Sequence, residues 1–184
     1  FSKPLQLLSV GRWNRAKGYQ YAINAVKNLY ERDIVVRYTI IAHGNPSEDI
    51  LALINNDGLN DKVSLKTTYN QEDVYQWMYR SDCLLLPSIE EGIANVVLES
   101  MAIGLPVISS DCGGMSEVIT HGINGFLVNP GNSALLADMI SNFSDCNEKE
   151  ISKIISNAKK TIEQNHSINN YLTEFHYFYR RLLN

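Results

Sequence analysis

Residues 83–110 read CLLLPSIEEGIANVVLESMAIGLPVISS, and this stretch indicates the fold. Two short apolar runs within it, CLLLP (83–87) and PVISS (106–110), have the length and composition of buried strands. The segment between them is long enough for a helix that starts near Asn95. A strand, a helix and a second strand in this order predict parallel strands joined by a right-handed crossover.

The same alternation continues on both sides of that stretch. Further strands are predicted at LQLLSV (5–10), VVRYTIIA (35–42), VSL (63–65) and GFLV (125–128). Helices are predicted after Gly18, near residues 47–56, and after Asn70, whose side chain should cap a helix N-terminus. We therefore predict an α/β fold, a doubly wound, Rossmann-like parallel sheet of about six strands flanked by helices, with C-terminal helices.

After Pro130 the pattern is helical only. Two amphipathic stripes predict helices that pack on the core, and their apolar positions are Leu135, Leu136, Met139, Ile140 and Phe143, then Ile151, Ile154, Ile155, Ala158 and Ile162. Ser167 is predicted to cap a final helix. The aromatic residues of that helix spread over more than one face, and they are Tyr171, Phe175, Tyr177, Phe178 and Tyr179. Such a surface suits contact with a further part of a longer protein.

Composition excludes several classes of protein. The chain has 184 residues, 45% of them hydrophobic and 20% charged, with a net charge of −4, which is typical of one globular domain. Basic and aromatic residues do not cluster, so nucleic acid is not the expected partner. Cys83, Cys112 and Cys146 lack metal-binding spacing and are expected to be reduced thiols of a cytoplasmic protein. The first residue is not Met, so we expect a piece of a longer protein.

Two acids flank the predicted turn before the helix. Ligands of doubly wound sheets bind beyond the carboxyl ends of the strands, and Glu91 lies at such an end. Unpaired amides at the start of the helix, approached through Gly92, Ile93 and Ala94, form the outline of a phosphate site. Glu99 lies roughly 6 Å further along the helix axis than Asn95. Both carboxylates could then accept hydrogen bonds from sugar hydroxyls on either side of a phosphate.

The loop GRWNRAKG (11–18) after the first strand supplies positive charge. Arg12 and Lys17 could both reach a diphosphate, whereas Arg15 is interpreted as a surface charge. Together with the two acids, these cations predict a site for a sugar nucleotide.

These motifs resemble those of a known family, the C-terminal, donor-binding domain of GT-B fold retaining glycosyltransferases (family 4, glycosyl transferases group 1). The resemblance covers roughly residues 5–183 and includes GR-x4-KG from Gly11 to Gly18, IIAHGNP, RSDCLLLPS and the E-x7-E block from Glu91 to Glu99. His43 stands where the family more often has glycine. Ile93 and Ala94 replace the commoner Phe and Gly or Pro.

The resemblance implies a role for each site residue. Arg12 and Lys17 would bind the donor diphosphate, Glu99 the ribose and Glu91 the transferred sugar, so Arg12, Lys17 and Glu91 are the catalytic candidates. The donor-binding set implied by the family comprises Gly11, Arg12, Lys17, Glu91, Gly92, Ile93, Ala94, Asn95, Glu99 and Tyr69. Substituting Glu91 by Gln would then leave binding of the free nucleotide nearly intact.

The resemblance also implies the partners and the extent of the protein. The donor would be a UDP- or GDP-linked sugar, with no cofactor and no metal, and the chain contains no D-x-D pair. Residues 1–184 would be a single nucleotide-sugar-binding domain, inactive alone, with 167–184 as a crossover helix. A missing N-terminal domain would bind the acceptor, and the full-length protein would work in the cytoplasm with peripheral association with the membrane.

Two other classes of protein share a doubly wound sheet. A dehydrogenase or epimerase would need G-x-G-x-x-G after the first strand, and SVGRWNRAKG lacks it. A non-catalytic nucleotide-binding or regulatory module stays open, because the candidate residues are all binding residues.

Overall fold

The computed structural model describes residues 4–67 and 70–168 and, after these, Asn170, Leu172, His176 and Arg180. Six parallel strands form one sheet in the order β3-β2-β1-β4-β5-β6. Their bounds are β1 (Leu5–Arg12), β2 (Val36–His43), β3 (Val63–Lys66), β4 (Cys83–Leu86), β5 (Val107–Ser110) and β6 (Phe126–Val128). The predicted fold class and all six predicted strands are confirmed.

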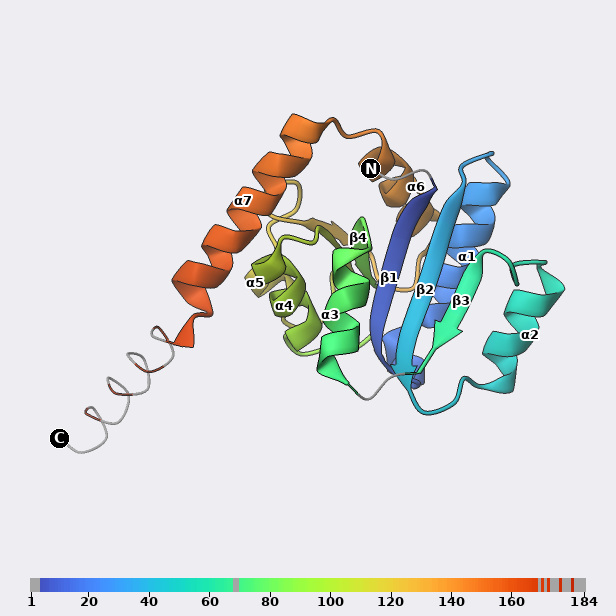
Figure 1. Ribbon diagram of the computed structural model, residues 1–184, viewed down its shortest axis with the longest axis horizontal. Coiled ribbons are helices and arrows are strands. Elements are labelled where there is room, and N and C mark those ends of the chain that lie inside the picture. Colours follow the sequence, from blue (N-terminus) through green and yellow to red (C-terminus); the bar gives the residue numbers. More distant parts are fainter. Residues whose placement is uncertain are drawn as a thin grey trace.

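Helices cover both faces of this sheet (Figure 1). They are α1 (Tyr19–Tyr30), α2 (Glu48–Asn56), α3 (Gln71–Tyr79), α4 (Asn95–Ile103), α5 (Met115–Val118), α6 (Ser133–Ser144) and α7 (Glu148–Asn165), with a 3₁₀ turn η1 (Arg15–Lys17). Residues of α1, α2 and α6 share one hydrophobic core, and residues of α3, α4 and α5 share the other. The long helix α7 packs on α4 and contributes to both cores.

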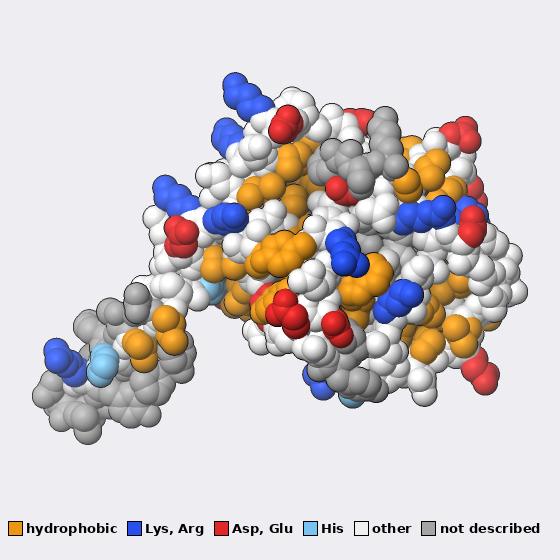
Figure 2. Space-filling model, viewed as in Figure 1, with side chains coloured by type: hydrophobic (Ala, Val, Ile, Leu, Met, Phe, Trp, Pro, Cys, Tyr) orange, Lys and Arg blue, Asp and Glu red, His pale blue; other side chains and the backbone are white. Residues whose placement is uncertain are grey.

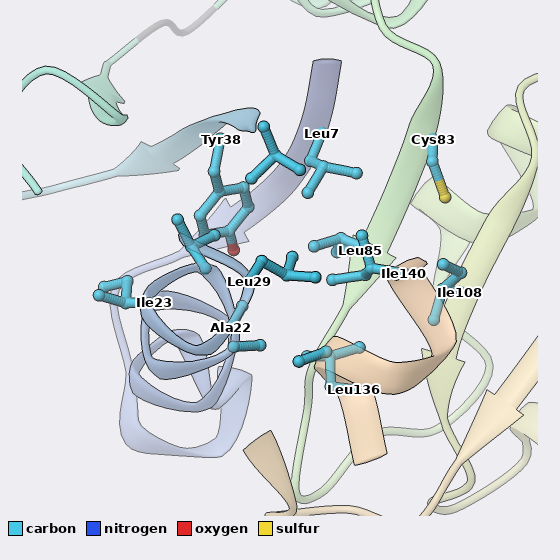
Figure 3. Packing of buried hydrophobic residues seen from close by; sticks show 14 of the residues in the cluster. Leu7, Ala22, Ile23, Leu29, Tyr38, Cys83, Leu85, Ile108, Leu136 and Ile140 are labelled. Atoms are coloured by element: carbon cyan, nitrogen blue, oxygen red, sulfur yellow. The ribbon is translucent and has the colours of Figure 1, made fainter. Parts of the chain in front are cut away.

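Alternate side chains of each strand enter opposite cores. In β1, Leu7 faces the α1 and α6 side, and its neighbour Leu8 faces the α4 side. Figure 3 shows the first of these cores, in which strand residues Leu7, Tyr38, Leu85 and Ile108 point toward Ala22, Leu29, Leu136 and Ile140 of the two helices. Each fully buried Leu or Ile contributes about 1.5–3 kcal/mol relative to an exposed one. The sheet is therefore a rigid platform for the loops at its ends.

Local predictions about helix ends are confirmed where the structure describes them. The Asn70 side chain accepts a hydrogen bond from the Glu72 amide at 3.0 Å, at the start of α3. The Ser167 hydroxyl accepts one from the Asn170 amide at 3.3 Å, as a cap does. The aromatic residues predicted for the final helix lie outside the described residues. Leu135, which we placed in the core, is 41% exposed, because α6 turns Leu136 inward instead.

Charged side chains of both signs are spread over the surface (Figure 2), and the three cysteines form no disulfide. Lys and Arg side chains lie scattered among acidic and neutral ones on the face shown in Figure 2. All three cysteines are free, with Cys83 and Cys112 buried and Cys146 half-buried. In the part of the chain that the structure describes, no helix is both long and apolar enough to cross a membrane.

The strand order creates a switch point between β1 and β4. From β1 the chain proceeds outward to β2 and β3, then returns to pair β4 against the other edge of β1. The chain therefore continues from β1 to α1 on one face of the sheet and from β4 to α4 on the other, and such a switch point is where ligands of doubly wound sheets bind. In Figure 1 the carboxyl ends of β1 and β2 lie at the lower edge of the molecule.

Candidate functional site

A cavity of about 580 Å³ lies at this switch point. Its lining residues are Val10, Gly11, Arg12, Lys17, His43, Asn70, Gln71, Val74, Glu91, Ile93, Ala94, Asn95, Val96 and Glu99. The structure thus brings together all of the site residues proposed from the sequence except two. Gly92 is not part of the lining, and Tyr69 lies outside the described residues.

Lys17 and Glu91 form an ion pair across this cavity, although 74 residues separate them in the sequence. The Lys17 Nζ lies 2.5 Å from the Glu91 Oε2, and the two side chains are only 17% and 19% exposed. The buried Ser88 hydroxyl donates a second hydrogen bond to the same carboxylate oxygen, at 3.3 Å. Glu91 is therefore held between a cation and a hydroxyl at the wall of the cavity.

The loop after β1 is folded tightly against the loop after β4. The Asn14 side chain accepts a hydrogen bond from the Lys17 amide at 3.0 Å and so caps the η1 turn. The Ile89 amide donates to the Ala16 carbonyl at 2.7 Å, which ties the two loops together. Gly18 ends the turn with a φ of +62°, a left-handed conformation that favours glycine. These contacts fix the position of the Lys17 main chain.

A second glycine turn supports Glu91 from behind. The Gly114 amide donates to the Gly92 carbonyl at 3.2 Å. Gly113 has a φ of +55°, and a side chain there would overlap the Glu91 carbonyl oxygen. Gly92 therefore contributes a backbone acceptor that braces the turn, and the Gly113–Gly114 loop positions the Glu91 main chain.

The N-terminus of α4 opens into the cavity. Ala94 is its N-cap and supplies no side-chain hydrogen bond, so the first helix amides have no side-chain cap. Asn95 and Val96, the first two residues of α4, both line the cavity. The positive end of the helix dipole adds to the charge of Arg12 and Lys17 there. These groups together give this end of the cavity positive charge.

Glu99 lies one turn further along α4 and has a partner of its own. The Gln71 amide group donates to the Glu99 Oε1 at 3.2 Å and to the Tyr75 hydroxyl at 3.1 Å. This contact orients the Glu99 carboxylate along the cavity wall.

Six of the lining residues were not predicted from the sequence, and they are Val10, His43, Asn70, Gln71, Val74 and Val96. Asn70, Gln71 and Val74 come from the start of α3, and His43 ends β2 directly beside Arg12. The sequence indicated His43 only as a departure from the family pattern, and Asn70 only as a helix cap. Their position after strand ends was the signal that could have placed them at the site.

Two neighbouring groups experience the charge of Glu91. Burial raises the pKa of the Tyr19 hydroxyl, and the nearby Glu91 carboxylate raises it further. Burial also raises the pKa of the Cys112 thiol, with Glu91 acting in the same direction and Lys17 in the opposite one. Both groups therefore stay protonated near neutral pH.

A second cavity shares no described lining residue with this site. Among the described residues no group of three or more His, Cys, Asp or Glu side chains is arranged to hold a metal ion. This second cavity, of about 510 Å³, lies between the loop after β1 and the start of α2. Arg15 lines that second cavity and is absent from the lining of the first.

Comparisons with known proteins identify the family of the chain. The chain is 32% identical over 98% of its length to the amylovoran biosynthesis glycosyltransferase AmsK of Erwinia amylovora, and it spans 44% of that protein. A glycosyltransferase crystal structure from Rickettsia africae superposes with a TM-score of 0.88 at 25% identity, covering all of this chain and 49% of the other.

Anabaena HepE in complex with UDP-glucose shares the fold, with a TM-score of 0.76 at 24% identity over 92% of this chain and 49% of the other. The chain thus spans about half the length of the proteins it matches. The family model "Glycosyl transferases group 1" matches residues 1–161, so this chain belongs to that glycosyltransferase family.

Proposed function

We propose that this chain is the donor-binding half of a retaining glycosyltransferase, which binds a nucleotide-diphosphate sugar for transfer to an acceptor hydroxyl. One observation carries the proposal: two cations, a helix N-terminus and two carboxylates surround a single cavity at the β1–β4 switch. A volume of about 580 Å³ falls in the range of small-molecule sites.

Each part of such a donor has a chemical partner in the cavity. Arg12, Lys17 and the α4 amides suit the diphosphate, since all three present positive charge. Glu99, oriented by Gln71, suits the ribose hydroxyls on one side, and Glu91 suits the sugar hydroxyls on the other.

The same groups would assist the reaction. As the bond from the sugar to the diphosphate breaks, negative charge grows on the leaving phosphate. Arg12, Lys17 and the helix amides would stabilise that charge where it develops, and such preorganised donors are the largest contribution in many enzymes. Catalysis without a metal is part of this proposal, because two side-chain cations occupy the position at which the charge appears.

The names of similar proteins suggest donor and acceptor classes. HepE is described in complex with UDP-glucose, which supports a UDP-linked sugar as the first donor to test. AmsK is named for amylovoran biosynthesis, which supports a growing polysaccharide as the acceptor. The part of the longer protein that lies outside this chain would bind that acceptor.

Calorimetric titration of the chain with UDP, GDP, ADP and their sugars tests the proposal. We expect one diphosphate series to bind clearly more tightly than its nucleoside. Absence of binding in all three series would contradict the proposal. A non-catalytic nucleotide-binding module would give the same titrations but no turnover in a longer protein containing this chain.

A further inference from the structure

The Lys17–Glu91 ion pair joins the two side chains that would contact different parts of the donor. Lys17 would bind the diphosphate and Glu91 the transferred sugar, yet in this structure their charged atoms lie 2.5 Å apart. We propose that this pair makes the site prefer the sugar-carrying diphosphate over the bare nucleoside diphosphate, and so promotes release of the latter after transfer. The inference rests on the proposed function.

A bare diphosphate must compete with Glu91 for the same ammonium group. If Lys17 kept both contacts, the carboxylate and a phosphate oxygen would lie only about 5 Å apart, since each hydrogen bond to nitrogen spans about 2.5–3 Å. Two anions at that separation repel each other, and the repulsion is stronger in a partly buried site than in water. The bare diphosphate therefore weakens the ion pair or binds beside an unfavourable charge.

Glu91 has little freedom to avoid this competition. Its carboxylate is also bound by the buried Ser88 hydroxyl, and its main chain is braced by the Gly113–Gly114 loop. Lys17 has a flexible four-carbon side chain, so Lys17 is the partner that moves. Its departure would leave the Glu91 carboxylate, only 19% exposed, without a counterion. Such an unpaired and partly buried charge is costly.

A sugar on the diphosphate removes that cost. Its hydroxyl groups are hydrogen-bond donors, and a carboxylate accepts short, charge-assisted bonds from them. The intact donor thus offers Lys17 a phosphate and Glu91 a sugar hydroxyl at the same time. After transfer the hydroxyls leave with the sugar, Glu91 again attracts Lys17, and the remaining diphosphate loses part of its cationic contact.

The inference changes what is expected of one substitution. From the sequence we expected Glu91→Gln to leave binding of the free nucleotide nearly intact. With the ion pair in the structure, we now expect Glu91→Gln to tighten bare diphosphate binding, because Lys17 no longer has an anionic partner in the protein. Loss of an ion pair of this kind changes the binding free energy by about 1 kcal/mol, which is about fivefold in affinity.

Calorimetry on the 184-residue chain tests this directly, with UDP against UDP-glucose and GDP against GDP-mannose. The diphosphate and sugar-carrying diphosphate that bind the wild-type chain are then used to measure the affinities of the Glu91→Gln and Glu90→Gln variants. Glu90 is an exposed neighbour outside the cavity lining, so it controls for the loss of one negative charge. We expect the preference for the sugar-carrying form to fall about fivefold in Glu91→Gln and to persist in Glu90→Gln.

A Lys17→Met background separates the ion pair from general repulsion. There, Glu91→Gln should no longer tighten the bare diphosphate, because no ammonium remains to be released. Unchanged or weaker diphosphate binding in Glu91→Gln alone would overturn the inference while leaving the proposed function intact. If neither the diphosphates nor their sugars bound the wild-type chain, the proposed function itself would be wrong.

Discussion

Gly18 packs directly against Pro87, so closely that a side-chain carbon on Gly18 would overlap the Pro87 carbonyl oxygen. This contact joins the end of the loop after β1 to the first residue beyond β4. Lys17 precedes Gly18, and Glu91 follows Pro87 by four positions. The close approach therefore explains why the two halves of the ion pair meet.

Gly18→Ala should destabilise the protein more than Gly58→Ala. Both glycines have a φ of +62°, but a side chain at Gly58 would meet nothing within 4 Å. The backbone strain alone costs about 1 kcal/mol. The overlap at Gly18 should raise the loss in free energy of unfolding to about 2–4 kcal/mol. Urea unfolding of both variants checks this, and equal losses would show that the contact with Pro87 is easily relieved.

Lys17→Ala and Arg12→Ala should each weaken binding of a nucleoside diphosphate and leave nucleoside binding nearly unchanged. Charge-assisted hydrogen bonds to phosphate are worth about 1.5–3 kcal/mol each. For a bare diphosphate Lys17→Ala should have the smaller effect, because in the wild-type chain Lys17 must leave Glu91 before it binds a phosphate.

Arg15→Ala is the matched control for this experiment. Arg15 belongs to the same loop but lines the second cavity, so its removal should change diphosphate affinity little. Calorimetry with diphosphate and nucleoside measures the difference. Losses of similar size for both ligands would show that Arg12 and Lys17 do not bind the phosphates.

Much of the fold could be predicted because it depends on local patterns. The six strands are short apolar runs, and Asn70 and Ser167 are typical capping residues, so each is visible within a few positions. The four-residue helix α5 was missed because it is too short to show a helical period. The exposure of Leu135 could not be predicted either. Leu135 and Leu136 belong to the same apolar stripe, and only their packing in the folded protein distinguishes them.

The members of the site could be predicted, but not the contacts between them. Position at the carboxyl ends of strands, together with the family resemblance, placed Arg12, Lys17 and Glu91 around one ligand. The sequence does not show that β4 rather than β2 or β3 carries the loop facing Lys17, so the ion pair could not be foreseen. Gln71 was missed for the same reason, since its contact with Glu99 depends on where α3 lies over the sheet.

Glu99→Gln should weaken binding of ribonucleotides and spare their 2′,3′-dideoxy forms, because the carboxylate is proposed to accept from the ribose hydroxyls. Gln71→Ala should have the same selectivity with a smaller effect, since it removes only the contact that orients Glu99. A hydrogen bond to a charged group is worth about 1.5–3 kcal/mol, and Gln71→Ala should cost less than this because it acts on the ribose only through Glu99.

Gln76→Ala provides the control on the same helix, because Gln76 bonds Glu72 at 3.4 Å and does not line the cavity. Competition titrations with ribo- and dideoxynucleotides separate the three variants. If Glu99→Gln weakened both nucleotide forms equally, the ribose would have to bind elsewhere.

The last prediction is that this chain binds donor weakly and transfers no sugar alone. It spans 44% of AmsK and 49% of the Rickettsia glycosyltransferase, and we propose that the groups that bind the acceptor lie in the part of such proteins that this chain does not span. Ile89 and Ile93, on either side of the Glu91 turn, are 38% and 40% exposed. We propose that a further domain covers these two apolar side chains.

Water can reach the diphosphate while that surface is exposed, and the charge contacts of Arg12 and Lys17 are then weaker. A turnover assay on the chain with UDP-glucose and a panel of glycan acceptors should therefore show no product. The same assay on a protein extended to the length of the relatives should show transfer, with the nucleotide affinity raised by exclusion of water. Sustained transfer by the 184-residue chain would contradict the proposal that it is half of an enzyme.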